Sequence, residues 1–239
     1  MIDAPWKPVI YSESSCHIEH VGGNTKNKNY GAWPVCTNLL PSSPLVYSFG
    51  IGPDISFDVS MVQDFGAKSV FCYDPTVDKD HFAKLVATYN SSNISDQLHF
   101  SQIGIGESNG IIKFFKSENP KIGSLVSTPG LKGYQTQPHI TAPVLELSSL
   151  VAMNRHEWVD LVKMDVEGAE FDIFSAMLDV NKLPTSQILI EFHARMLPNG
   201  FEQQEKIYQK FIAAGWEMAY EQPGSKEEVV FIRVKPKSG

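Results

Sequence analysis

The sequence is poor in basic residues, and no segment of it concentrates them. Lys and Arg total 20 against 27 Asp and Glu, which gives a net charge of -7 at pH 7. Proteins that bind nucleic acid neutralise its phosphates with clustered Lys and Arg, often interleaved with aromatic side chains. The scattered basic residues therefore argue against nucleic acid as the main partner and favour a small or neutral one.

Long apolar runs are also missing. No stretch reaches the roughly 18 consecutive apolar residues of a membrane-spanning helix, so we expect no membrane span. Residues 1–16 lack the basic start and apolar centre of a secretory signal peptide. We expect a chain that is soluble as given. Its compartment stays open between the cytoplasm and, for a chain trimmed of an anchor, the lumen of the secretory pathway.

Cysteine is scarce, with 3 residues in the chain. Cys72 lies in an apolar segment and is predicted to be a buried thiol. Cys16 and Cys36 flank a polar segment and are able to form one disulfide if the compartment is oxidising. No spacing of the cysteines resembles a zinc site.

Residues 1–44 are rich in proline and polar residues, so we expect an irregular N-terminal extension that packs on the domain and reaches the rim of its active site. The domain itself is expected to cover 45–239. There, strand patterns alternate with helix patterns, which indicates an α/β fold with a doubly wound, Rossmann-like and mostly parallel sheet. A C-terminal strand pair, 216–222 and 227–234, is expected to add an antiparallel strand.

The expected elements follow from runs of apolar residues and from helical spacing. A further strand, 109–116, is expected outside the parallel core, followed by a long loop over 116–142. The expected parallel strands are 45–50, 69–74, 98–106, 158–165 and 187–193, and the expected helices are 54–65, 78–89, 148–154, 167–178 and 201–214.

A glycine turn follows the first expected strand. Gly50 and Gly52 allow the backbone to approach a ligand closely, where a Cβ atom would collide. Asp74 ends the second strand, at the edge where ligands bind in a doubly wound sheet, and an acid there accepts hydrogen bonds from ribose hydroxyls. Together they predict a nucleoside cofactor. The alternative is a plain glycine turn with Asp74 as its cap.

A nicotinamide dinucleotide is the competing cofactor. Its fingerprint has a third glycine where the helix packs on the strand, and that position is Ile55 here. Asp54 lies in the same turn, where its charge is poorly placed against a pyrophosphate. A sulfonium cofactor is cationic and has no phosphate, so the acidic turn fits it better.

Several segments together resemble the FkbM-type methyltransferases, a branch of the class I S-adenosylmethionine-dependent enzymes. The resemblance covers about residues 45–234, and the DVEGAE block is its most diagnostic piece. The segments are VYSFGIGPDISFD at 46–58, CYDPT at 72–76, QIGIGESNG at 102–110, DLVKMDVEGAEFDIF at 160–174, LIEFH at 189–193, and the closing GWEMAY and VVFIRV.

This resemblance implies the class I methyltransferase fold and S-adenosylmethionine as the cofactor. The cofactor-binding residues that it implies are Gly50, Gly52 and Asp54 in the glycine turn, Asp74 at the ribose, Gln102 and Ile103 at the adenine, and Asp165 at the methionine end.

The fourth and fifth strands end in polar residues that are candidates for catalysis. These strands are expected to be neighbours, so Asp165 shares a cleft with Glu191 and His193, which point to the same side of a regular strand. Methyl transfer to an alcohol needs a base to take the proton. His193 is the first choice because its reference pKa is close to working pH. Asp165 is the alternative base, and a His193 that only caps its strand is the structural alternative.

The acids of the DVEGAE block also suggest a metal. Asp165 and Glu167, with Glu170 beyond them, gather at a strand end, where carboxylates hold Mg²⁺ or Ca²⁺ and lower the pKa of a bound hydroxyl. The simpler account is that Glu167 stabilises the first turn of a helix and that Glu170 faces solvent or a lysine. We therefore expect no dedicated metal site and keep a divalent metal as the alternative.

The sequence thus predicts an S-adenosylmethionine-dependent O-methyltransferase that acts on a hydroxyl, foremost of a sugar in a glycan or glycoconjugate. The O-methylation and the sugar follow from the resemblance. Polar donors in the 116–142 loop, such as Lys121 and Gln135, suit a hydroxyl-rich acceptor. Two alternatives are O-methylation of a small lipid-like or polyketide metabolite, and a non-catalytic binding module that keeps the fold.

Overall fold

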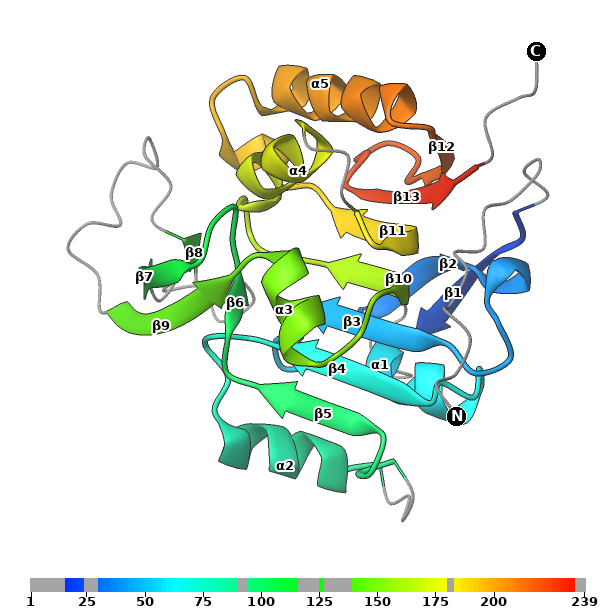
Figure 1. Cartoon of the computed structure of the whole chain (residues 1–239), viewed down its shortest axis with the longest axis vertical. Helices are drawn as coiled ribbons and strands as arrows, with labels where there is room; N and C mark the ends of the chain where they lie inside the picture. Colours follow the sequence, from blue (N-terminus) through cyan, green and yellow to red (C-terminus); the bar gives the residue numbers. More distant parts are fainter. Residues whose placement is uncertain are drawn as a thin grey trace.

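The computed structural model describes residues 16–23, 30–89, 94–115, 125–126, 139–179 and 183–234. A seven-stranded sheet forms the centre of these residues (Figure 1). Its strands, in spatial order, are β12 (Trp216–Glu221), β13 (Glu228–Arg233), β11 (Thr185–Glu191), β10 (Val159–Met164), β3 (Leu45–Phe49), β4 (Ser69–Tyr73) and β5 (Leu98–Ser101).

One strand of this sheet runs against the others. The pairs from β11 through β10, β3 and β4 to β5 are parallel, whereas β13 is antiparallel to both β11 and β12. Each residue of β3 and β10 is buried, as a central parallel strand with helices on both faces requires. The mostly parallel sheet with a C-terminal antiparallel strand is therefore confirmed, and so is the adjacency of the fourth and fifth expected strands.

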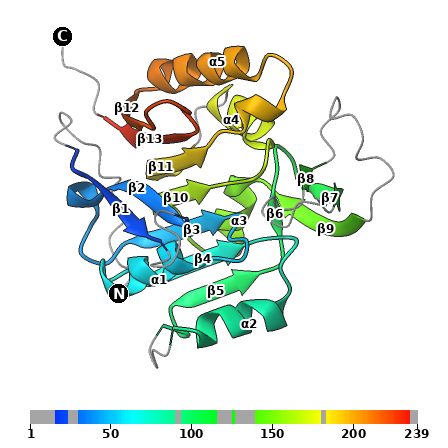
Figure 2. The same cartoon turned by 180° about the vertical axis from the view of Figure 1, so that it is seen from behind.

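Helices cover both faces of the sheet. One face carries α3 (Leu147–Met153), α4 (Glu170–Asp179) and α5 (Gly200–Ala213), and their apolar side chains share a core with the sheet. The opposite face, seen from the front in Figure 2, carries α1 (Ser56–Gln63) and α2 (Lys79–Ala87). Among the described helices, none is long and apolar enough to cross a bilayer.

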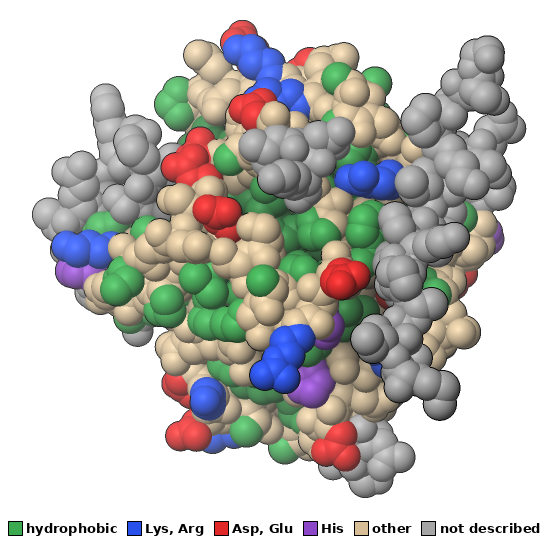
Figure 3. Space-filling model, in the orientation of Figure 1, with side chains coloured by type: hydrophobic (Ala, Val, Ile, Leu, Met, Phe, Trp, Pro, Cys, Tyr) green, Lys and Arg blue, Asp and Glu red, His purple; other side chains and the backbone are tan. Residues whose placement is uncertain are grey.

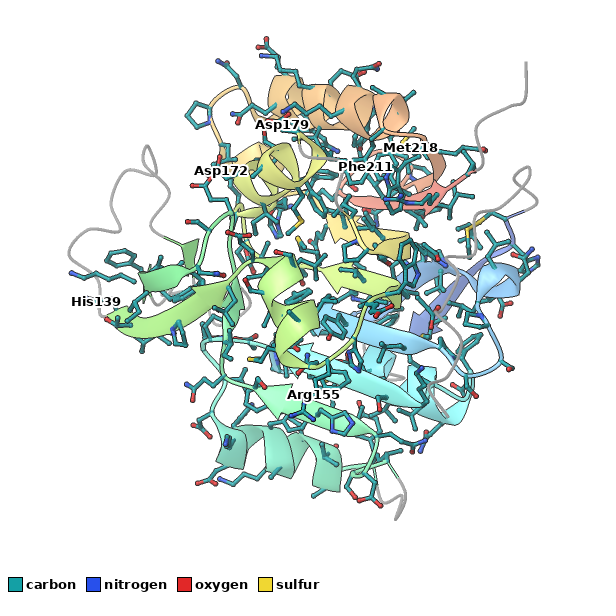
Figure 4. The ribbon with its side chains drawn as sticks, in the orientation of Figure 1. His139, Arg155, Asp172, Asp179, Phe211 and Met218 are labelled. Atoms are coloured by element: carbon teal, nitrogen blue, oxygen red, sulfur yellow. A yellow bond between two sulfur atoms is a disulfide. The ribbon has the colours of Figure 1, made fainter. Side chains whose placement is uncertain are left out.

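Aromatic stacking fixes α5 on the sheet. Phe211 points from α5 toward the sheet (Figure 4) and stacks on Phe231 of β13 with the ring centroids 4.1 Å apart. Lys210 on the same helix pairs with Asp179 at the end of α4, 2.7 Å away. Since truncation of a buried Phe typically costs about 3–5 kcal/mol, the Phe211 contact contributes much of what holds this helix.

The N-terminal segment contains a hairpin where the sequence predicts irregular chain. β1 (Ile18–Gly22) pairs with β2 (Ala32–Cys36) in antiparallel register, and a disulfide joins Cys16 to Cys36. The backbone N–H of Cys36 donates to Oε1 of Gln187 on β11 at 2.8 Å. Side chains of both strands join the core on the α1 face, so the hairpin is part of the domain's packing. A short 3-10 turn, η1 (Thr37–Leu39), follows it.

A second, smaller sheet lies beside the carboxyl ends of the large one. It contains the expected strand near 109–116 and also strands within the expected 116–142 loop, whose remaining residues, including Lys121 and Gln135, lie outside the described residues. His139 lies at the outer end of this sheet (Figure 4). In spatial order, the strands are β6 (Gly104–Ile105), β9 (His139–Leu145), β7 (Gly110–Phe115) and β8 (Leu125–Val126).

Candidate active site

Two glycines shape the turn after β3, and they do so for different reasons. Gly50 has a positive φ of 70°, and a Cβ atom there would lie 1.6 Å from the carbonyl oxygen of Asp165. Gly52 also has a positive φ, but a Cβ atom there would meet nothing within 4 Å. The close approach at Gly50 is therefore made by the protein's own backbone, while Gly52 borders open space.

Asp74 holds the same turn from the end of β4. Its Oδ2 accepts the N–H of Gly52 at 3.0 Å. Its Oδ1 accepts the N–H and the hydroxyl of Thr76, at 2.8 and 2.7 Å, and the N–H of Val77 at 3.3 Å. Each carboxylate oxygen offers about two acceptor positions, so Oδ2, which has one donor, keeps room for one more. Asp74 thus stabilises the turn through its hydrogen bonds, and its carboxylate is still able to accept one from a ligand hydroxyl.

A cavity of about 350 Å³ opens at this edge of the sheet. Its volume falls within the range typical of small-molecule sites, roughly 300–1,000 Å³. The lining comes from the N-terminal hairpin, the glycine turn, the small sheet and the ends of five strands of the large sheet: Tyr30, Gly31, Ala32, Trp33, Phe49, Gly50, Ile51, Gly52, Pro53, Asp54, Tyr73, Asp74, Pro75, Thr76, Gly104, Ile105, Phe114, Lys163, Asp165, Val166, Glu167, Ala169, Glu191, His193, Arg195 and Glu228.

The structure brings together most of the residues that the sequence singles out. The glycine turn, Asp54 and Asp74 line one part of the cavity, and Asp165, Glu191 and His193 line another. Gln102 is exposed and donates from Nε2 to the carbonyl oxygen of Pro75 at 3.3 Å, and neither it nor Ile103 is among the lining residues. Their neighbours Gly104 and Ile105 line the cavity instead.

His193 lies at the centre of a group of carboxylates. Its Nδ1 is 3.2 Å from Oε1 of Glu170, which also accepts the backbone N–H of His193 at 2.6 Å. Its Nε2 is 3.4 Å from Glu167 and 3.8 Å from both Asp165 and Glu191. Glu170 is fully buried, so the expectation that it faces solvent or a lysine is wrong.

These carboxylates decide the protonation of His193. Burial alone would lower its pKa, but the hydrogen bond and charge of Glu170, followed by Asp165 and Glu167, outweigh that effect and raise the pKa to about 10. A ring that keeps its proton at neutral pH does not accept another. The surroundings of His193 therefore disagree with its role as the general base that the sequence favours.

Two further carboxyl groups share this part of the cavity. Glu228 on β13 lies directly opposite Glu191 on β11. Burial, followed by the charge of Asp165, raises the pKa of Glu191 to about 7. Burial, followed by the charges of Glu227 and Asp165, does the same for Glu228. Carboxyl groups with raised pKa values in a cavity are a common property of functional sites.

Lys163 connects the glycine turn to the N-terminal hairpin. It is buried on β10, and its Nζ donates to the carbonyl oxygens of Gly50 at 2.6 Å and Phe49 at 3.2 Å. The same Nζ lies 4.6 Å from the centre of the Trp33 ring, a cation–π contact. A lysine between apolar residues of a buried strand needs such partners. Its position in the segment LVKM is the signal in the sequence that could have identified it.

Residues of the N-terminal segment lie at the rim of this cavity, where the sequence analysis expects that segment to reach. Tyr30, Gly31 and Trp33 contribute to the lining. Sequence reasoning missed these residues, and it also missed Arg195 and Glu228. On the face shown in Figure 3, the Lys and Arg side chains of the described residues lie at several separate places.

A parallel sheet in this order, closed by one antiparallel strand and carrying a glycine turn opposite an acid, is the architecture of a class I methyltransferase. The model of the Methyltransferase FkbM domain matches residues 20–221. The chain therefore belongs to the FkbM methyltransferase family, whose methyl donor is S-adenosylmethionine. No curated protein matches the chain significantly.

Solved structures of similar proteins include an FkbM methyltransferase from Methylobacillus flagellatus, with 12% identity and a TM-score of 0.48. The alignment covers 82% of this chain but 45% of that protein, so the chain spans less than half of its length. A second is Sp1610 from Streptococcus pneumoniae, a putative tRNA methyltransferase in complex with S-adenosylmethionine, with 9% identity, a TM-score of 0.44, and coverage of 85% of this chain and 72% of that one.

Proposed function

We propose that this protein transfers the methyl group of S-adenosylmethionine to a hydroxyl group, foremost of a sugar in a glycan or glycoconjugate. The observation that carries this proposal is the meeting of two sets of residues in one cavity. The glycine turn and Asp74 lie at one part of it, and the carboxylates of Asp165 and Glu191 lie at another.

The residues of the first set fit the cofactor. Gly52 borders open space, so a nucleoside is able to lie against its backbone. Asp74 has one acceptor position left for a ribose hydroxyl. Asp54 adds a negative charge to the turn, which favours a cation over a pyrophosphate. When bound, S-adenosylmethionine supplies an electrophilic methyl group on a positively charged sulfur.

The second set of residues fits an alcohol as the acceptor. Carboxylates accept hydrogen bonds from hydroxyl groups and so orient them. We assign the transfer of the proton to Glu191, because its carboxylate lines the cavity while Asp165 is also close to Lys163, at 3.9 Å. As the oxygen gains the methyl group, its proton passes to Glu191.

The character of this lining favours a sugar over a lipid-like acceptor. The cavity near Glu191 is bordered by Asp165, Glu228 and Arg195, which are polar or charged. A lipid-like acceptor would place apolar surface against the carboxyl groups of Asp165 and Glu228 and exclude water from them, which is costly for polar groups that it cannot hydrogen-bond. A hydroxyl-rich acceptor satisfies them.

Two measurements on the purified chain test the proposal. Isothermal titration calorimetry is expected to show binding of S-adenosylmethionine and S-adenosylhomocysteine, and absence of binding would favour the non-catalytic module. A glycan array with a labelled methyl donor is then expected to show transfer to sugar hydroxyls. Transfer only to lipid-like alcohols, or only to amines, would contradict the sugar assignment.

A matched pair of variants tests the role of Glu191. Glu191→Gln is expected to lower kcat at least tenfold and to leave the affinity for S-adenosylmethionine unchanged, because a general base contributes about 10²–10⁴-fold. Glu221→Gln on β12, whose side chain does not line the cavity, is the control and is expected to retain full activity. An unchanged kcat for Glu191→Gln would move the role to Asp165.

A further inference from the structure

The buried imidazole of His193 points one nitrogen at three carboxylates. Its Nδ1 contacts Glu170, whereas Nε2 makes no hydrogen bond to any residue in the described part of the chain. The nearest charged oxygens to Nε2 belong to Glu167 at 3.4 Å and to Asp165 and Glu191, each at 3.8 Å. One potential ligand atom from each of Asp165, Glu167 and His193 lies within 4.8 Å of the other two.

The distances from Nε2 to the carboxylate oxygens of Glu167 and Asp165 fit coordination of a shared cation better than direct hydrogen bonds. A hydrogen bond between a ring nitrogen and a carboxylate oxygen has a length of about 2.7–3.2 Å. Ligand atoms that are each about 2.1 Å from one cation lie roughly 3–3.5 Å apart. The Nε2 atom and the two carboxylates therefore surround a point that a cation is able to occupy after small side-chain adjustments.

Glu170 prepares the ring for such a role. A histidine that binds a metal through one nitrogen usually donates the other N–H to a carboxylate or a carbonyl, which fixes the tautomer and the orientation of the ring. The fully buried Glu170 is that carboxylate for Nδ1, and it also accepts the backbone N–H of His193. Nε2 then faces the carboxylates of Glu167 and Asp165, where a cation would take the place of its proton.

We propose that Asp165, Glu167 and His193 bind one divalent cation at the acceptor part of the cavity. Two carboxylates offset its charge, and one imidazole favours a first-row transition metal such as Mn²⁺ over Ca²⁺ or Mg²⁺, which prefer oxygen ligands alone. All three residues line the cavity, so coordination positions remain open on the cavity side.

The cation site deepens the proposed function and rests on it for its role in the reaction. A positive charge beside Glu191 would stabilise the negative charge that develops on the acceptor oxygen as its proton leaves. It would also take the place of the proton on Nε2 of His193. His193 then serves as a metal ligand. This role explains why its ring is buried among carboxylates, and it does not require His193 to act as the general base.

Titration calorimetry of the full chain with Mn²⁺, without cofactor or acceptor, tests the site directly. The protein is expected to bind one Mn²⁺, and His193→Ala and Asp165→Asn are each expected to weaken binding at least tenfold. Glu228→Gln is the matched control, because its carboxylate lines the same cavity outside the proposed ligand set, and it should bind within about twofold of the parent. Mg²⁺ and Ca²⁺ are expected to bind more weakly than Mn²⁺.

Glu167→Gln keeps the test valid if His193→Ala does not fold, since the Glu167 side chain is 20% exposed and stands before α4. It too should weaken Mn²⁺ binding. No binding at millimolar Mn²⁺, or binding that the ligand variants leave unchanged, would overturn the proposal. Methyl transfer without Mn²⁺ binding would contradict the cation site and leave the proposed function standing. Mn²⁺ binding without methyl transfer would support the cation site and contradict the proposed function.

Discussion

Replacement of Lys163 by methionine is expected to lower the free energy of unfolding by about 3–5 kcal/mol. The variant keeps most of the side-chain volume but removes a buried charge that donates to the carbonyl oxygens of Gly50 and Phe49. It also removes the charge that lowers the pKa of the fully buried Asp58. Breaking one side of a buried charge pair typically costs about this amount, because the remaining charge stays buried.

Urea unfolding at pH 7, followed by tryptophan fluorescence, measures this loss. Lys210→Met is the control, because it breaks an exposed pair with Asp179, and such pairs are worth about 0–1 kcal/mol. In the double variant Lys163→Met with Asp58→Asn, the unpaired carboxylate is gone, so at least about 1 kcal/mol of stability should return. A loss below about 1 kcal/mol for Lys163→Met, or strict additivity in the double variant, would refute the reasoning.

Three further predictions concern other parts of the fold. Gly50→Ala should abolish cofactor binding and lower the melting temperature, because its Cβ atom would lie 1.6 Å from the carbonyl oxygen of Asp165; a variant that melts like the parent would contradict this. Burial, the largest influence, raises the pKa of Asp58 from 3.8 to about 6, so roughly 3 kcal/mol of stability is present below pH 4 and lost as pH rises through 6. In Asp58→Asn, the free energy of unfolding measured in urea should not fall in this way between pH 4 and pH 7. A fall as large as that of the parent would contradict the role of Asp58. Replacement of Cys16 and Cys36 by serine should reduce unfolding free energy by about 3 kcal/mol for their separation of 20 residues, and an equal urea midpoint would exclude this.

The large sheet was predictable because each of its strands carries its own signal. Apolar runs that end in glycine or aspartate gave the parallel strands, and their alternation with helices placed Asp165 beside Glu191. The start of α4 was placed three residues too early. Glu167 has a positive φ of 54°, so the helix begins only at Glu170, the last residue of the DVEGAE block, and composition does not reveal this turn.

The parts that were missed depend on contacts between distant segments. The N-terminal hairpin is fixed by the hydrogen bonds of Cys36 with Gln187, 151 residues away, and no local pattern encodes them. Glu170 shows the same limit. An acid in a first helical turn normally faces solvent, and only the position of His193, 23 residues later, explains its burial. Residues whose burial depends on a remote partner are therefore the least predictable from sequence.

The contact between Gly50 and Asp165 has a consequence for engineering. The backbone N–H of Asp165 also donates to the carbonyl oxygen of Phe49 at 3.1 Å, so the glycine turn and Asp165 are held in one fixed arrangement. A library that varies Gly50 or Asp165 would therefore disturb the binding of the cofactor and of the acceptor together. Acceptor range is better explored at Arg195 and Glu228, which border the cavity on segments that this contact does not include.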